Sequence, residues 1–488
     1  MSTSIIESFK FAFSSPKRLR TEVLAGLVVA LALVPEAISF SILAGVDPRL
    51  GLFASCTMAV TIAFTGGRPA MISAATGAVA VVIAPVAREY GIDYFLATVL
   101  LAGVLQIIMA VFGVAKLMRF IPRSVMIGFV NALSIIVFMA QLPHLIGVPW
   151  LVYPLVAAGI AIMVFFPRFT TVIPAPLVTI LAISAVVLVT GWSVPNVADQ
   201  GELPQSFPEL LLPNVPLNVD TLRIIFPYAL AMALVGLLES LLTAKLVDDI
   251  TDVHSDKTRE GWGQGVANIV TSLFGGMGGC AMIGQTMINV RESGARTRLS
   301  TLLAGIFILL LSVSLGDIVG LIPMAALVAI MIMVSVGTMD WHSIHPRTLR
   351  LMPWSETAVM LTTVIATLFT NLAVGVILGV ITAMVMFARR VAHLADVEKH
   401  EADGVDTYSI KGQLFFASSN DLVYSFDYAH AAKHVVIDLT GAEIWDASTV
   451  ATLDSVTRKF EERGTSVEII GLDGPSLARL QKLTGQLN

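Results

Sequence analysis

The sequence predicts an α-helical membrane protein of fourteen spans, arranged as two inverted repeats of seven, with a small α/β domain at its C-terminus. Of its 488 residues, 56% are hydrophobic and only 13% are charged, whereas soluble domains carry about 25% charged residues. Apolar stretches follow one another from Thr21 to Phe387, and a soluble-domain composition begins after Arg389 and Arg390. Two short glycine-rich segments recur at matching places in the two halves.

The changes in polarity along the chain divide it into six parts. Ile5–Phe13 has the pattern of a short amphipathic helix lying on the inner membrane surface. The proline-rich stretch Trp192–Pro216 is expected to cross over between the repeats on the outside. The predicted parts are an N-terminal cytosolic segment 1–20, transmembrane repeat 1 at 21–192, an outer connecting loop 193–220, transmembrane repeat 2 at 221–390, a linker 391–405 and a small cytosolic domain 406–488.

Fourteen segments qualify as spans, although a helix needs about 20 apolar residues to cross the hydrocarbon core. Three of them, 71–87, 261–275 and 280–291, are too short or too rich in glycine to cross comfortably. The other eleven fall at 21–44, 49–65, 94–115, 123–141, 151–166, 174–192, 221–245, 299–315, 321–338, 355–371 and 373–388.

Positive charge gives the orientation of these spans. With the N-terminus inside, the inner connectors hold thirteen lysines and arginines and the outer connectors hold three. Such an excess is usual on the cytoplasmic side. The bias therefore predicts a multi-pass protein of the bacterial inner membrane with both termini in the cytoplasm.

Two of the short segments, 71–87 and 280–291, are each the third span of a set of seven. Because seven is odd, the two sets are inverted relative to each other, and inverted repeats with short interrupted helices are typical of secondary transporters. A helix that begins at mid-membrane leaves its first amide N–H groups unpaired and directs the positive end of its dipole at that point. Two such ends facing each other predict an anion site without a basic side chain.

The residues expected to bind this anion are small and lie at the start of each half-helix. An alternative is that the glycines only permit tight helix packing, but their recurrence at matching positions favours binding. The predicted substrate-binding residues are Ser73, Thr76, Gly77, Ala281, Met282, Ile283 and Gly284.

Glu36 and Glu239 are the carboxylates placed well inside predicted spans, one in the first helix of each repeat. An ionised group there costs at least about 2.5 kcal/mol and rarely persists without a role. The alternative is that each glutamate is permanently neutral and hydrogen-bonds a neighbouring helix. We expect instead that Glu239, together with Glu36, couples transport to a proton. Thr243 lies one turn after Glu239 and shares its face.

Other functions find no support in the sequence. His144, His342 and His345 lack metal-ligand spacing, and we find no phosphate-binding loop, nucleotide motif or catalytic triad. The charged run Asp248–Glu260 has mixed sign and is expected to be a solvated inner loop. The chain is therefore predicted to be neither an enzyme nor a nucleic-acid binder, with no metal and no cofactor beyond a coupling ion.

The C-terminal part alternates strand and helix patterns, which suggests a small α/β sheet domain. A polar helix cap is expected at Asp446-Ala447-Ser448. Strands are expected at Tyr408–Phe416, His434–Leu439 and Val467–Ile470, with helices within Ala417–Ala432, at Thr449–Arg463 and at Ser476–Thr484.

Three motifs resemble a known family. Gly278–Asn289, continued by Gly294–Ser300, looks like the tenth-helix signature of the sulfate permease family. Leu237–Ala244 is similar to the eighth helix of that family. Val435–Asp438, followed by Asp446–Ser448, resembles the STAS domain that these permeases share with bacterial anti-sigma-factor antagonists.

The resemblance implies a core and a gate domain, a homodimer, and an anion held between helices three and ten by Thr76, Gly77 and Ala281–Gly284. Glu239 and Thr243 would occupy the place where relatives bind sodium or a proton. Ser448 matches a serine that is phosphorylated in signalling relatives, although Ala447 replaces the neighbouring serine, which favours a capping role for Ser448.

Two departures from the family pattern bear on substrate and mechanism. Ala281–Asn289 lacks the arginine of animal members, which favours carrier transport over channel-like conduction. Ala74 and Ala75 replace a Gly-Pro pair found in several relatives, which changes the expected pocket.

These observations predict a secondary active transporter of small anions (dicarboxylate, sulfate or bicarbonate) that works as a proton-coupled symporter by alternating access. Its partners would be a small inorganic or carboxylate anion, the lipid bilayer, a second copy of the chain and a cytosolic partner of the STAS-like domain. One alternative is a sodium-coupled bicarbonate or sulfate symporter. Another is a membrane sensor or scaffold that presents the STAS-like domain.

Overall fold

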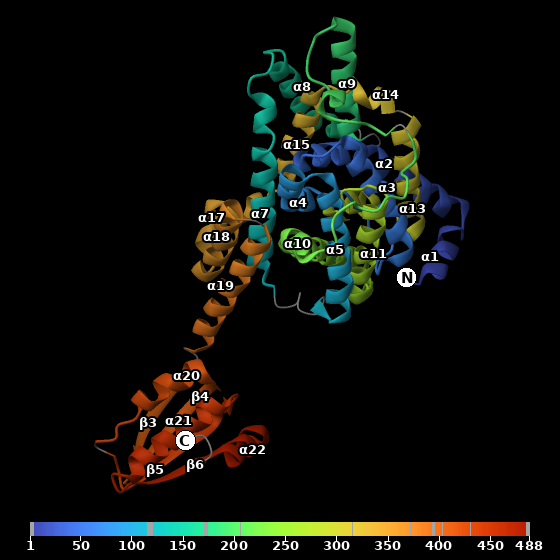
Figure 1. The fold of residues 1–488 in the computed structure, drawn as a ribbon. Coiled ribbons are helices and arrows are strands. Elements are labelled where there is room, and N and C mark those ends of the chain that lie inside the picture. Colours follow the sequence, from blue (N-terminus) through green and yellow to red (C-terminus); the bar gives the residue numbers. More distant parts are fainter. Residues whose placement is uncertain are drawn as a thin grey trace. The chain divides into compact units, whose positions relative to one another are not determined.

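The chain forms two compact units, residues 1–379 and 380–488, in the computed structural model (Figure 1). The structure describes residues 4–114, 121–169, 174–204, 206–314, 316–370, 372–392, 396–402, 404–429 and 431–484. The predictions above also use residues outside the described ranges, namely positions 1–3, 115–120 (which include Lys116 and Arg119), 170–173, 205, 315, 371, 393–395, 403, 430 and 485–488.

A helical segment occupies each of the fourteen predicted spans. Among the described residues, five helices are long and apolar enough to cross a membrane: α2, α3, α5, α7 with the turn η2, and α10. The number of spans itself stays a prediction. The elements of the first repeat and its connections are α1 (Ile5–Ala12), α2 (Pro16–Ala44), α3 (Pro48–Thr65), β1 (Ser73–Ala74), α4 (Gly77–Tyr90), α5 (Ile92–Val111), α7 (Arg123–Met139), η2 (Leu142–Leu145), α8 (Val152–Phe165), η3 (Phe166–Arg168), α9 (Ala175–Thr190) and η4 (Val197–Gln200). Those of the second repeat are α10 (Val219–Thr251), α11 (Lys257–Leu273), β2 (Cys280–Ala281), α12 (Ile283–Met287), η5 (Ile288–Glu292), α13 (Arg298–Ser314), α14 (Gly316–Gly320), α15 (Met324–Thr338), α16 (Trp341–Ile344), α17 (Pro346–Leu351), α18 (Trp354–Phe369) and α19 (Leu372–Ala392).

Local chemistry explains where the longest helices begin and end. The side chain of Ser15 accepts the N–H of Arg18 at the start of α2, next to Pro16 in the first turn. The same helix ends at Gly45, which has the left-handed conformation (φ 75°) that favours glycine after a helix. Asn218 caps α10 by accepting the N–H of Thr221.

The helices of the first unit pack as two groups. The core group consists of α2, α3, α4, α5, α10, α11, α12 and α13, and the gate group consists of α7, α8, α9, α15 and α18 (Figure 1). The groups meet where α2 packs against α9 and α15, and where α4 approaches α7. This arrangement agrees with the expected division into core and gate.

Two short strands cross at the centre of the core group. β1 pairs antiparallel with β2, with Ser73 opposite Ala281 and Ala74 opposite Cys280. α4 follows β1, and α12 follows β2 and continues directly into the π-helical segment η5. The paired broken helices expected from the sequence are therefore confirmed. A Cβ atom on Gly279 would collide with the carbonyl oxygen of Ala74, so this crossing requires glycine.

The second unit carries a four-stranded sheet in the order β3-β4-β5-β6. β3 pairs antiparallel with β4, and the other pairs are parallel. Tyr408, Ile437, Leu453 and Phe460 are among the fully buried side chains of its core. Its elements are β3 (Asp396–Ala402), β4 (Val405–Leu414), α20 (Phe416–Leu422), η6 (Val423–Ser425), β5 (His434–Ile444), α21 (Ala447–Glu461), β6 (Ser466–Ile470) and α22 (Gly474–Leu483).

Two details of this domain differ from the sequence expectation. β3 lies within the segment 391–405 that was expected to be a linker, because a charged edge strand that pairs on one side has a linker-like composition. Asp446, rather than Ser448, caps α21. Its carboxylate accepts the N–H of Thr449 at 3.1 Å and the N–H of Phe416 at 2.7 Å. Ser448 is exposed in the first turn of α21.

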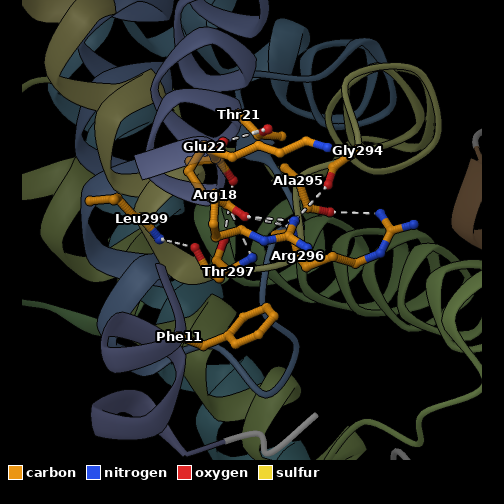
Figure 2. A network of polar contacts seen from close by, with 12 residues as sticks. Phe11, Arg18, Thr21, Glu22, Gly294, Ala295, Arg296, Thr297 and Leu299 are labelled. Atoms are coloured by element: carbon orange, nitrogen blue, oxygen red, sulfur yellow. Dashed lines mark hydrogen bonds and ion pairs between the residues drawn. The ribbon is translucent and has the colours of Figure 1, made fainter. Parts of the chain in front are cut away.

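A buried carboxylate ties the start of α2 to the turn that follows η5 (Figure 2). Glu22 is fully buried and accepts the N–H groups of Arg296 at 2.9 Å and Thr297 at 3.3 Å. Arg18 lies 3.7 Å from the Glu22 carboxylate and donates to the carbonyl of Gly294 at 3.2 Å. The half-helix segment α12–η5 is therefore anchored at its far end to α2.

Replacing Glu22 by alanine is expected to lower the melting temperature of the purified protein. The change leaves two amide N–H groups of a buried turn without their acceptor, and each unsatisfied buried group costs about 1–3 kcal/mol. Thermal unfolding in detergent measures the loss. Glu7→Ala, at an exposed position of α1, is the control and should leave the melting temperature unchanged. Equal melting temperatures for both variants would contradict the anchoring role.

Candidate functional site

A cavity of about 280 Å³ lies where the N-terminal ends of α4 and α12 meet. The core group forms one wall through these two helix ends and through α2 and α10, and the gate helices α7 and α15 form the other. No lysine, arginine or histidine is among the described residues that line it. The lining consists of Glu36, Phe40, Thr76, Gly77, Ala78, Phe129, Val130, Leu133, Ser134, Val137, Glu239, Leu242, Met282, Ile283, Gly284, Val334, Ser335, Gly337 and Thr338.

The two helix ends supply positive potential to this cavity. The first-turn amides of each helix, including those of Gly77 and Gly284, have no partner within the helix. α12 has five residues, but the helical path runs on through η5 to Glu292. Thr76 caps α4, since its hydroxyl accepts the N–H of Val79 at 3.4 Å. An anion between the two ends would meet amide N–H groups and aligned dipoles.

Most of the predicted site residues line the cavity, and three lie behind it. Ser73 and Ala281 pair in the crossing strands, and the Ser73 hydroxyl accepts from Gln264 at 2.7 Å. The Thr243 hydroxyl donates to the carbonyls of Glu239 at 2.8 Å and Ala281 at 3.2 Å. Thr243 therefore fastens α10 to β2 rather than facing the cavity. The predicted residues that do line it are Glu36, Thr76, Gly77, Glu239, Met282, Ile283 and Gly284.

Glu239 is joined to the half-helices through a cysteine. The Cys280 thiol donates to the Glu239 carboxylate at 3.0 Å, and its sulfur lies 3.2 Å from the Thr76 hydroxyl. The neighbouring Ser240 hydroxyl accepts the N–H of Ala281 at 3.0 Å. Consecutive residues of α10 thus hold consecutive residues of β2.

Glu36 has a comparable link to α12. Gln285, in the first turn of α12, lies close to the Glu36 carboxyl group and interacts with it. Both glutamates therefore interact with a polar side chain of a neighbouring element, as the alternative reading expected, and both also line the cavity. Sequence reasoning missed Gln285, which is 2% exposed and has no signal beyond its place in the motif.

A polar stripe on α11 supports both strands and was also missed. Gln264 donates to Ser73 and, at 2.8 Å, to Glu260. Asn268 exchanges two hydrogen bonds with the backbone of Gly279, at 2.9 and 3.1 Å. The signal was present, because residues 260, 264 and 268 recur at the four-residue spacing of one helix face.

The charged run Asp248–Glu260 is not simply solvated, contrary to the sequence expectation. Glu260 is fully buried and accepts the N–H groups of Gly67 at 2.8 Å and Arg68 at 3.2 Å. Asp248 is 8% exposed and forms ion pairs with Arg68 and Lys257. Both carboxylates lie near the junction of α10 and α11, and buried charges of this kind require such partners.

The gate wall is held by a reciprocal pair of serines. Ser134 on α7 donates to the carbonyl of Ser335 on α15 at 2.7 Å, and the Ser335 hydroxyl donates back to the carbonyl of Ser134 at 2.7 Å. Most of the other gate residues that line the cavity are apolar, namely Phe129, Val130, Leu133, Val137 and Val334. The wall that faces the two helix ends is therefore predominantly apolar.

Sequence comparison shows that the chain is similar to known anion transporters along most of its length. The sulfate permease family matches residues 19–153 and 151–363, and the STAS domain matches residues 396–485. A Bacillus subtilis (strain 168) protein named "Putative sulfate transporter YbaR" is 48% identical over 466 residues, which cover 95% of this chain and 97% of that protein. The "Bicarbonate transporter BicA" of Picosynechococcus sp. is 26% identical, with 96% and 91% covered.

Solved structures show the same fold. Murine Slc26a9, described as an anion transporter in the inward-facing state, superposes with a TM-score of 0.81 at 16% identity, over 95% of this chain and 87% of that chain. The transmembrane domain of a cyanobacterial BicA gives 0.65 at 23% identity, over 76% and 98%. The family match over most of the first unit, together with the 48% identity to a full-length relative, shows that this chain is a membrane transporter, not an enzyme, and belongs to the sulfate permease family.

Proposed function

We propose that this protein is a secondary active symporter that moves a small anion together with a proton. The observation that carries the proposal is the cavity in which two half-helix ends meet beside two carboxyl groups, with no basic side chain among its described lining residues. The helix ends would attract the anion. A carboxyl group in such a place suits the binding and release of a proton.

Alternating access would come from movement of the core group against the gate group. At the Val334–Thr338 end of α15, the gate wall borders the cavity. At the other end, Met324–Ile330 is buried in an apolar cluster with Ala37 and Ile38 of α2. With the predicted orientation, this apolar contact closes the outer side. The transport cycle would therefore have to open the contact between α2 and α15 while the opposite side closes.

Sulfate is the first candidate substrate because the relative with 48% identity is named as a sulfate transporter. Bicarbonate is the second, because two relatives named BicA also match along most of the chain. Helix dipoles and small side chains select for negative charge more than for shape, which keeps dicarboxylates as a third candidate. We further propose a bacterial cytoplasmic membrane location with both termini inside, and a homodimer, as the family resemblance implies.

A panel of labelled anions tests the proposal. Purified protein in liposomes is expected to accumulate at least one of sulfate, bicarbonate and succinate when the outside is made acidic, and to do so without sodium. Protein-free liposomes are the control. Accumulation that depends on a sodium gradient and not on pH would replace the proton by sodium as the coupling ion. Anion binding without any flux would favour the sensor or scaffold alternative.

A further inference from the structure

We propose that the Cys280 thiol is a positioning residue that transmits the protonation of Glu239 to the Thr76 hydroxyl, and so controls whether that hydroxyl can donate to the anion. The inference rests on the proposed proton-coupled function and deepens it. It assigns a role to a side chain that lies outside the cavity.

The geometry places the thiol between the two groups. Cys280 is fully buried, 3.0 Å from the Glu239 carboxylate and 3.2 Å from the Thr76 hydroxyl. Thr76 and Glu239 both line the cavity, whereas Cys280 stands behind its wall in strand β2. The thiol thus contacts the expected proton carrier and the cap of the expected anion-binding helix at once.

The number of protons on Glu239, Cys280 and Thr76 allows this chain of hydrogen bonds two states. An ionised carboxylate only accepts, and a thiol and a hydroxyl each have a single proton to donate. While Glu239 is ionised, the Cys280 thiol donates its proton to the carboxylate, and the Thr76 hydroxyl donates its proton to the sulfur. Once Glu239 is protonated, its O–H donates to the sulfur and the thiol proton turns to the Thr76 oxygen.

The second state leaves the Thr76 hydroxyl proton free to donate into the cavity. The Thr76 oxygen then accepts from both Cys280 and Val79, which uses its two lone pairs. The only proton added is the one on Glu239, and the other two protons rotate about their own atoms. Proton binding would therefore strengthen anion binding, and linkage makes the effect reciprocal.

Few other titratable groups face Glu239 among the described residues. The Cys280 thiol on β2 contacts it, and the Glu36 carboxyl on α2 shares the cavity. α12 has no charged residue. Of the other helices packed on α10, α4 carries Arg88 and Glu89 in its last turn, α5 carries Asp93 in its first, and α11 carries Lys257, Arg259 and Glu260 in its first.

Infrared spectroscopy of the S–H stretch tests the relay without any ligand. A Cys56→Ala background removes the other buried thiol of the chain, so the band reports Cys280 alone. On acidification the band should move to higher frequency, because the thiol exchanges a charged acceptor for a neutral one. Adding Glu239→Gln should hold the band at its acidic position at every pH, and adding Cys280→Ser should abolish it. A band that stays in place with pH would overturn the proposal.

Uptake kinetics test the consequence for transport. In the Cys56→Ala background, the KM for labelled sulfate should fall with acidification, and Cys280→Ser should retain this dependence because serine keeps one donor and one acceptor. In Cys280→Ala the Thr76 hydroxyl has no sulfur to donate to, so its proton stays free at every pH. The KM should then lose its pH dependence and stay near its acidic value, about tenfold below that of the background protein at neutral pH, which is the gain expected for a hydrogen bond to a charged group. A normal pH dependence in Cys280→Ala would contradict the relay but would leave the proposed proton coupling standing. If the background protein shows no response to pH in uptake, the proposed proton coupling fails, and the infrared band still decides on the relay.

Discussion

Glu239→Gln is expected to abolish the accumulation of labelled sulfate driven by an acidic exterior, a loss of at least about tenfold, within the range of coupling free energies between two sites. Glutamine keeps the size of the side chain and can still reach the Cys280 sulfur, which contacts residue 239 at 3.0 Å. It neither binds nor releases a proton, so the pH gradient can no longer drive transport by this variant. Uptake into proteoliposomes with and without the gradient measures the effect.

A matched control keeps this experiment specific. Glu356 is exposed in the first turn of α18, and Glu356→Gln should leave the accumulation unchanged. Exchange of labelled for unlabelled sulfate should persist in Glu239→Gln, because exchange needs no net proton movement. Gradient-driven accumulation at the normal level in Glu239→Gln would exclude this residue as the proton carrier. Glu36→Gln, tested in parallel, would show whether the coupling belongs to Glu36 instead.

Gly279→Ala is expected to prevent folding of the core group, or to destabilise it by about 3 kcal/mol or more, as overpacking against a rigid backbone does. The new methyl group would run into the carbonyl oxygen of Ala74 across the strand crossing. Both half-helix ends are positioned by this crossing. Sulfate uptake should be lost together with the melting transition of the purified protein.

Gly320→Ala is the control for this substitution. Its methyl group would meet side-chain atoms of Leu203 and Ala198 no closer than 3.2 Å, and these atoms can shift. It should leave the melting temperature and the uptake close to those of the unmodified protein. A Gly279→Ala protein that melts normally and transports sulfate would show that the strands can separate without loss of the site.

The sequence predicted the architecture because its signals are long or repeated. Hydropathy separated the membrane unit from the C-terminal domain, and the paired glycine-rich segments indicated the two half-helices that meet at β1 and β2. Thr76, Gly77 and Met282–Gly284 could be predicted as lining residues, because a helix end at mid-membrane defines where a ligand would lie.

The remaining features depend on contacts that a single sequence does not display. Ser73 and Ala281 were predicted to bind the anion and do lie next to the cavity, but they pair with each other behind it. Strand pairing decides which side chains face the cavity. Gln285 gains a role only when α12 lies next to α2. β3 lies in the predicted linker, because the charged residues of this edge strand give it the composition of a linker. The four-residue spacing of Gln264 and Asn268 is visible in the sequence, but only the contacts with Ser73 and Gly279 show what these side chains hold.

The cavity wall without a fixed cation has an electrical consequence. With no lysine, arginine or histidine among its described lining residues, only protons bound by Glu36 and Glu239 can offset the charge of the anion. The charges of the protein itself return to their starting place over a full cycle, so the net charge moved is that of the anion plus the protons that travel with it. A monovalent anion that travels with one proton would then move no net charge, whereas sulfate with one proton would move one negative charge. Each such charge is worth about 2.3 kcal/mol per 100 mV. A membrane that is negative inside would therefore oppose sulfate entry and leave bicarbonate entry unaffected, so that uptake measured against an imposed voltage reports the charge of the substrate.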